Sequence, residues 1–156
     1  MNAILHLSTG SMGPALTLPM LTDGSILRIS REIIKPFYRE KMQHALDCIE
    51  RLFVGCPYRV HRPEGAFFLW MWFEGLPISS AELYSRLKKR GVIILPGHHF
   101  FPGLMESWRH CHECIRISYS QEASVVERGL AVIAQEVREL FCIGLADSPD
   151  AKAGNG

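Results

Sequence analysis

The sequence predicts an α+β domain, a two-layer sandwich in which helices pack against a small and mainly antiparallel sheet. Three observations support this fold class. Apolar residues recur at helical spacing over residues 32–53 and again over residues 122–141. A further helix is marked by capping signals at both ends, near Ser79 and Gly91. Short apolar runs separate these segments, so the predicted order is helix, two strands, helix, two strands, helix.

The helices differ in how clearly their ends are marked. Pro36 lies inside the periodic pattern of residues 32–53 and should start or kink that helix, because proline lacks a backbone N–H. In the middle helix, Ser79 is a candidate N-cap, and Glu82 three residues later completes a capping box. Gly91 follows three basic residues and provides a C-terminal stop.

Four strands are predicted from alternation, apolar runs and turn signals. Residues 58–62 alternate, and residues 92–97 and 114–120 are short apolar strands. The continuous apolar run 66–73 predicts a strand buried on both faces, with its two tryptophans on the same side. Core packing is the favoured interpretation of these aromatic side chains.

We expect three segments along the chain. Residues 1–30 are apolar, rich in small residues and without an evident partner element, so we interpret them as the remnant of a larger domain and as an interface segment. Residues 31–142 form the α+β domain, and the polar residues 143–156 should be disordered. Uncovered apolar side chains in the first segment favour self-association, so a homo-oligomer is expected. These side chains are Ile4, Leu5, Leu7, Leu16, Leu18, Met20 and Leu21.

Composition narrows the classes of function. Of the 156 residues, 47% are hydrophobic and 21% are charged, which is typical of a chain that folds, and the formal net charge is +1. Without a basic run, neither nucleic-acid binding nor membrane binding is expected. The five cysteines are odd in number and lack the spacing of a disulfide framework, so we expect reduced thiols in a cytoplasmic protein.

A dense group of histidines and cysteines lies at residues 110–114, shortly after His98 and His99. Thiolate and imidazole ligands together suit zinc. However, adjacent histidines cannot both point at one ion without an unusual backbone, and Arg116 would lie beside Cys114 on one strand face. Since a cation beside a ligand opposes metal binding, we expect no metal site here. A small zinc protein is the alternative.

Arg116 is the more informative residue of this stretch. It lies in the middle of the predicted strand, between two isoleucines, where its charge needs an anionic partner. The residues alone leave two interpretations open. Either Arg116 pairs with an acidic residue of this chain, or its planar guanidinium receives a ligand carboxylate through two parallel hydrogen bonds.

Two stretches resemble a known enzyme family. The run "VIILPGHHFFPG", followed by "CIRISYS" and the last helix, is similar to the C-terminal part of the class I pyridoxal-phosphate-dependent aminotransferases. With "RPEGAFFLWMWFEGLP" and "LYSRLKKRG" added, the resemblance covers about residues 1–140. It implies the small C-terminal domain of fold-type I, with pyridoxal phosphate as cofactor of the intact enzyme. It also implies transfer of an amino group between valine or alanine and a 2-oxo acid, pyruvate or 3-methyl-2-oxobutanoate.

The resemblance assigns roles to residues as well. Arg116 in "RISY" matches the family arginine that binds the substrate α-carboxylate, while His99 and Phe100 would lie at the entrance of the active site and contact substrate. The lysine that holds the cofactor has no counterpart among the lysines of this chain, which are Lys35, Lys41, Lys88, Lys89 and Lys152. We therefore expect no catalytic or cofactor-binding residue here and no activity of the chain alone. A non-catalytic, dimerising module of the same fold is the alternative.

Overall fold

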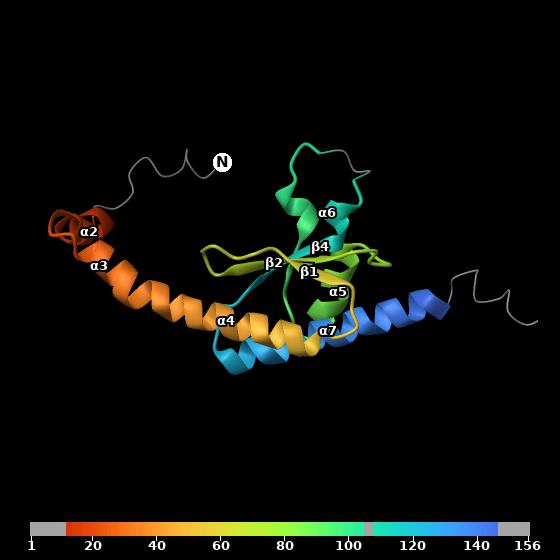
Figure 1. The fold of residues 1–156 in the computed structure, drawn as a ribbon. Helices are drawn as coiled ribbons and strands as arrows, with labels where there is room; N and C mark the ends of the chain where they lie inside the picture. The colour runs from red at the N-terminus through yellow and green to blue at the C-terminus, as the bar shows by residue number, and fades with distance from the viewer. Residues whose placement is uncertain (1–11, 105–107, 147–156) are drawn as a thin grey trace, which may run out of the picture. The chain divides into compact units, whose positions relative to one another are not determined.

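The computed structural model describes residues 12–104 and 108–146, and Figure 1 gives the order of the elements. The chain divides into two compact units, Met1–Arg39 and Glu40–Gly156. No helix within the two described ranges is both long and apolar enough to cross a membrane.

The first unit is helical, and none of its described residues is buried. It contains α2 (Met12–Thr22), α3 (Ser25–Ile29) and a short π-helical turn, η1 (Ser30–Ile34). The sequence had indicated no regular element before residue 32, since glycine and proline interrupt this part. Three of the apolar side chains expected to be uncovered are more than half exposed, namely Leu16, Leu18 and Leu21. Ile4, Leu5 and Leu7 lie outside the described residues.

Pro36 explains the change in helical hydrogen bonding before α4 (Lys35–Leu52). Proline has no N–H to donate, and its ring clashes with the carbonyl four residues earlier. The backbone N–H of Lys35 donates to the carbonyl of Ser30, five residues before it, as in a π-helix. The predicted irregularity at Pro36 is therefore confirmed, although α4 begins at Lys35 rather than at Glu32.

Four strands in the second unit form one antiparallel sheet, in the order β1-β2-β4-β3. They are β1 (Tyr58–Val60), β2 (Phe68–Phe73), β3 (Leu95–Pro96) and β4 (Cys114–Ser118). At the centre of the sheet, Trp70 is opposite Arg116 and Trp72 is opposite Cys114. Since opposite residues share a face, Arg116 lies on the same side of the sheet as both tryptophans.

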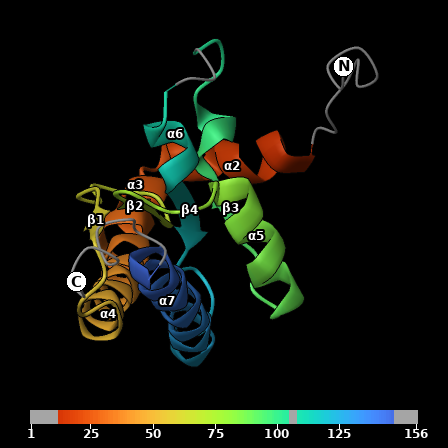
Figure 2. The same cartoon turned by 90° about the vertical axis from the view of Figure 1, so that its right-hand side faces the viewer.

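Helices cover the other face of the sheet. The C-terminal part of α4 and α7 (Ala123–Ala146) run side by side below the sheet in Figure 1, and α5 (Ser80–Lys89) lies next to α7 in Figure 2. The ring of Phe53, just after α4, stacks on Phe73 of β2 with centroids 5.9 Å apart. Leu69, Met71 and Ile115 on this face are completely buried. The predicted α+β sandwich is confirmed.

All four strands are shorter than predicted, and β1 and β4 each lack the last two of the predicted residues 58–62 and 114–120. Of the run 66–73, only Phe68–Phe73 is a strand, because Ala66 has a left-handed φ of 59° and belongs to the preceding turn. Burial alternates along this strand, so it is fully buried on one face and half-buried on the other. Of residues 92–97, only Leu95 and Pro96 pair with β4.

The ends of the last two long helices are partly as predicted. Ser79 caps α5, since its Oγ accepts the N–H of Glu82 at 3.2 Å. The Glu82 carboxylate bonds to Arg86 instead of completing the capping box. Helix α7 continues to Ala146, past the predicted end at residue 141, because the apolar pattern extends into the segment expected to be disordered. Residues 147–156 lie outside the described residues.

Candidate functional site

Arg116 lies in the middle of β4 with its guanidinium in contact with two aromatic rings. Its Cζ atom is 4.2 Å from the centre of the Phe68 ring and 4.4 Å from the centre of the Phe100 ring. Among residues 12–104 and 108–146, no acidic side chain pairs with it, and its buried Nε has no hydrogen-bond partner. A buried N–H without an acceptor is costly. Of the two open interpretations, the described contacts favour a ligand carboxylate over an internal ion pair.

Arg59 shows what a paired arginine on the same face of the sheet looks like. Its guanidinium lies 5.5 Å from the centre of the Trp72 ring. It also donates to Oε2 of Glu74 from Nη2 at 3.3 Å and from Nε at 3.4 Å. Both arginines therefore contact aromatic rings, although not the same ones. Only Arg59 has a carboxylate partner among the described side chains.

A cavity of about 190 Å³ lies beside Arg116. The loop of residues 61–65 forms one of its walls, and Phe68, Leu69 and Trp70 of β2 form another. Arg62 in the loop adds a second cationic side chain to the lining, and Glu64 in the same loop adds an acidic one. Aromatic walls with charged groups of both signs suit a small polar ligand that carries an apolar portion.

Phe100 reaches Arg116 because the turn η2 (Gly97–Phe100) packs closely on β4 and on α6 (His110–Glu113). A Cβ atom on Gly97 would lie 2.6 Å from the carbonyl oxygen of Cys111 and 2.7 Å from the Cβ of Cys114. No real Cβ approaches other atoms this closely, so only glycine fits without a shift of the backbone. The Phe100 ring is also edge-on to Trp70, with centroids 5.3 Å apart.

The adjacent histidines of η2 differ in their surroundings. His98 is half-buried, and its ring lies 4.1 Å from that of His99 and 5.8 Å from that of His112. Burial, and then the neighbouring His99 and His112, lower the pKa of His98 below its usual value. His99 is exposed beside Phe100. The turn therefore places His99 next to Phe100, and of the two only Phe100 has a described contact with Arg116.

Residues 110–113 of the dense histidine and cysteine group form α6, which leads directly into β4 at Cys114. The thiol of Cys111 donates to the carbonyl of Trp108 at 2.9 Å, and Sγ of Cys114 lies 3.5 Å from Nε2 of His110. Burial raises the pKa of Cys114 to about 11, which keeps this thiol protonated at neutral pH. That no metal binds this group stays a prediction.

A different group brings three potential metal ligands together. Within the described ranges, donor atoms of three such side chains lie within 4.8 Å of one another only at His44, Cys48 and Glu127. Sequence analysis missed this group because Glu127 lies on another helix. The spacing of His44 and Cys48, four residues apart in a helix, could have indicated half of it.

Glu113 is a further residue that the sequence did not single out. Its buried carboxylate accepts hydrogen bonds from the indole N–H of Trp72 at 2.8 Å and from the backbone N–H of Gly75 at 3.1 Å. It also pairs with Nε of Arg109 at 2.6 Å. Glu113 therefore fixes α6 to the end of β2, which positions the rim of the site.

Known aminotransferases are similar to this chain in sequence and fold. The valine–pyruvate aminotransferase of Escherichia coli (strain K12) is 44% identical over 141 residues, which are 90% of this chain and 34% of that protein. The solved valine–pyruvate aminotransferase of Salmonella typhimurium LT2 matches with a TM-score of 0.83 at 43% identity, over 91% of this chain and 37% of that one. The solved α-aminoadipate aminotransferase LysN of Thermus thermophilus, complexed with N-(5'-phosphopyridoxyl)-L-leucine, matches with a TM-score of 0.64 at 27% identity, over 80% and 30%.

These matches confirm the resemblance to aminotransferases that the sequence indicated. No protein-family profile matches the chain. The chain spans about a third of the length of the curated relative, 34%.

Proposed function

We propose that this chain is the carboxylate-binding domain of a pyridoxal-phosphate-dependent aminotransferase. In the intact protein it would act on valine or alanine and on the 2-oxo acids pyruvate and 3-methyl-2-oxobutanoate. The observation that carries the proposal is the guanidinium of Arg116, which has aromatic neighbours and no carboxylate partner among the described residues. The resemblance to valine–pyruvate aminotransferases supports the choice of substrates.

Arg116 would bind the α-carboxylate that every amino acid and every 2-oxo acid substrate carries. Rings that contact the flat faces of a guanidinium leave its N–H edge for an anion. A carboxylate matches that edge through two parallel hydrogen bonds. Because β4 is central in the sheet, the arginine is held on a rigid element, and the bound carboxylate orients the reacting carbon.

Phe100 would hold the guanidinium from the side of η2, where its ring contacts Arg116. We keep His99 as a second rim residue, because it is exposed next to Phe100. Its role would be contact with substrate rather than with Arg116.

The described residues do not fit the cofactor itself. When bound, pyridoxal phosphate supplies the electron-withdrawing ring that allows an amino group to move between carbon skeletons. The cavity beside Arg116 has no lysine in its lining, and Lys35, Lys41, Lys88 and Lys89 lie on helices α4 and α5. Lys152 lies outside the described residues. We therefore propose that residues outside this chain hold the cofactor and that the chain alone does not transaminate.

The test compares two arginines in the intact, cofactor-loaded protein. Arg116→Lys keeps the charge but loses the planar two-point contact, so kcat/KM should fall at least about tenfold, equally for valine, alanine and their 2-oxo acids. The matched control is Arg59→Lys, on the same face but paired with Glu74, and it should change kcat/KM little. Cofactor absorbance should be unchanged in both variants.

Two results would contradict the assignment. A loss confined to one substrate would show that Arg116 reads the side chain instead of the carboxylate. If most of the Arg116→Lys protein is unfolded but the remaining folded fraction keeps full activity, Arg116 is a structural residue.

A non-catalytic, dimerising module of this fold is the second candidate, and the exposed leucines of α2 favour it. Both proposals include assembly into a homo-oligomer. The cytoplasmic location inferred from the cysteines stays a prediction. Sedimentation of the chain over a range of concentrations tests the association. A strict monomer would exclude the module.

A further inference from the structure

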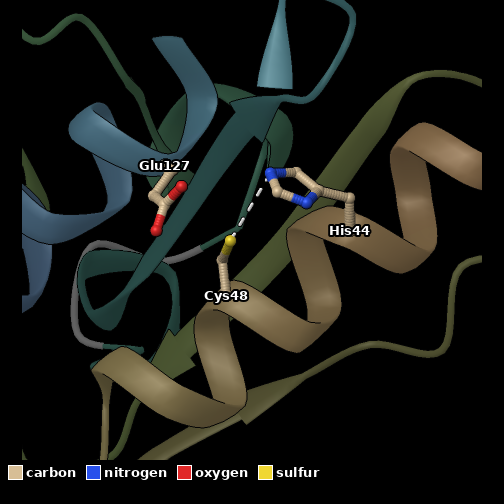
Figure 3. Close-up of side chains that lie close together, drawn as sticks. All are labelled: His44, Cys48 and Glu127. Carbon is tan, nitrogen blue, oxygen red and sulfur yellow. Dashed lines mark hydrogen bonds between the residues drawn. The ribbon is translucent and has the colours of Figure 1, made fainter. Parts of the chain in front are cut away.

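Three donor side chains from α4 and α7 converge on one point, away from Arg116 (Figure 3). His44 and Cys48 are one helical turn apart on α4, and Glu127 approaches them from α7. Sγ of Cys48 lies 3.6 Å from Nε2 of His44, and the donor atoms of all three residues lie within 4.8 Å of one another. A nitrogen, a sulfur and an oxygen ligand are thus gathered from two helices.

The separation of the nitrogen and sulfur atoms matches a tetrahedral ion. With bond lengths of about 2.3 Å to sulfur and about 2.05 Å to nitrogen, the two ligands of a tetrahedral zinc ion lie about 3.6 Å apart. His44 and Cys48 are already at this distance, 3.6 Å. Binding would therefore require little movement of α4.

The site is buried on one side and open on the other. Cys48 is only 2% exposed, whereas the side chain of Glu127 is 41% exposed. An ion could enter from the side of Glu127 and bind to a thiol that is shielded from solvent. A water molecule would complete the coordination on the open side.

A cation already lies next to these donors. Nη2 of Arg51 is 2.6 Å from Oε1 of Glu127 and 3.8 Å from Sγ of Cys48. The guanidinium of Arg51 thus forms an ion pair with the carboxylate of Glu127. The Arg51 side chain is itself 61% exposed, which allows it to turn out into solvent.

We propose that His44, Cys48 and Glu127 bind a divalent transition-metal ion of the zinc type, and that the ion replaces Arg51. A thiolate, a carboxylate and a neutral imidazole together balance a charge of +2. The metal–sulfur bond forms as the S–H bond of Cys48 breaks, and the proton leaves to solvent. The ion then links α4 to α7, the helices that cover one face of the sheet.

Cobalt(II) is the probe, because a thiolate bound to it gives a charge-transfer absorption that carboxylate and imidazole ligands do not give. The complete 156-residue chain, kept reduced, is titrated with cobalt and then with zinc. One equivalent of cobalt should produce the absorption, zinc should abolish it, and the melting temperature should rise with the concentration of either ion.

Three variants and one control test which side chains bind the ion. Cys48→Ser should abolish the charge-transfer absorption, and Glu127→Gln, a change at an exposed side chain, should weaken binding at least about tenfold. Arg51→Gln should tighten binding several-fold, because it removes the competing cation. The matched control is Cys114→Ser in the group at residues 110–114, which should leave the absorption unchanged.

Three outcomes would overturn the proposal. Absence of the absorption in the reduced wild-type chain at saturating cobalt would show that no thiolate site exists. An absorption that survives Cys48→Ser and disappears in Cys114→Ser would place the ion in the other group. Weaker binding in Arg51→Gln would show that Arg51 supports the cluster and does not compete with an ion.

Discussion

The two faces of the sheet use the same strands for different purposes. On the face toward α4 and α7, the side chains of β2 are completely buried and apolar. On the other face, Trp70 and Trp72 are half-buried, and Arg116 stands among aromatic rings without a described carboxylate partner. The first face stabilises the domain, while the second carries the charge that we propose binds a ligand carboxylate.

The largest expected effect is the loss of a leucine from the helix-covered face. Leu69→Ala leaves a cavity at a fully buried site and should lower the free energy of unfolding by about 2–5 kcal/mol. Leu95→Ala makes the same change on the other face, opposite Arg116, where the leucine is 41% exposed, and should cost less than about 1 kcal/mol. Urea unfolding measures both. Equal losses would show that the two faces are equally packed.

A smaller loss of unfolding free energy is expected at Glu113, whose carboxylate holds α6 on the face of the sheet that carries Arg116. Glu113→Gln replaces one carboxylate oxygen by an amide that cannot accept a hydrogen bond from Trp72 or Gly75. Leaving a buried donor unpaired should cost about 1–3 kcal/mol in urea unfolding. The exposed control Glu74→Gln should change stability by less than about 0.5 kcal/mol. If both variants match the wild type, Glu113 does not anchor this face.

Acidification should lower the stability of the folded chain through protonation of His98. Its pKa is lowered in the folded chain by burial and by His99 and His112, so the unfolded chain takes up the proton first. His98 should therefore not change the free energy of unfolding well above pH ~6.5. The free energy of unfolding should fall as the pH drops through this value. Melting temperatures measured across this range check the trend. His98→Asn should flatten it, and an unchanged slope would contradict the assignment.

The smallest expected effect is on the stability of Arg116→Met. This variant keeps an unbranched apolar side chain and removes a charge that has no ion pair among the described residues, so the free energy of unfolding should change by less than about 1 kcal/mol. Urea unfolding beside the Leu69→Ala protein gives the scale. A loss of about 3 kcal/mol or more would reveal a buried ion-pair partner for Arg116.

The helix-covered face was largely predictable from the sequence, because burial follows local periodicity. The shared face of Trp70 and Trp72 and the cap at Ser79 both appear in the structure, whereas burial on both faces of residues 68–73 does not. Arg116 could be selected as a candidate because a mid-strand charge conflicts with its apolar neighbours. Its contact with Phe68 could not be predicted, since the register of β2 against β4 depends on the whole sheet.

The histidine and cysteine groups also show that contacts between separate elements are not visible in the sequence. Residues 110–114 are dense in the sequence, yet α6 spreads their side chains into separate contacts with Trp108, Arg109 and Trp72. His44 and Cys48 are four residues apart on α4, whereas Glu127 is distant in the sequence and joins them only when α4 and α7 pack together. Spacing within a helix is visible in a sequence, whereas the approach of a second helix is not.

The close approach at Gly97 has a consequence for varying the sequence of η2. Libraries that vary this turn should keep position 97 fixed and diversify positions 98 and 99, because any side chain at 97 collides with Cys111 and Cys114. Phe100 is only three residues away, so a shift of that backbone would also move the ring from Arg116. The small size of Gly97 thereby determines which positions of the turn can change without moving β4 beneath it.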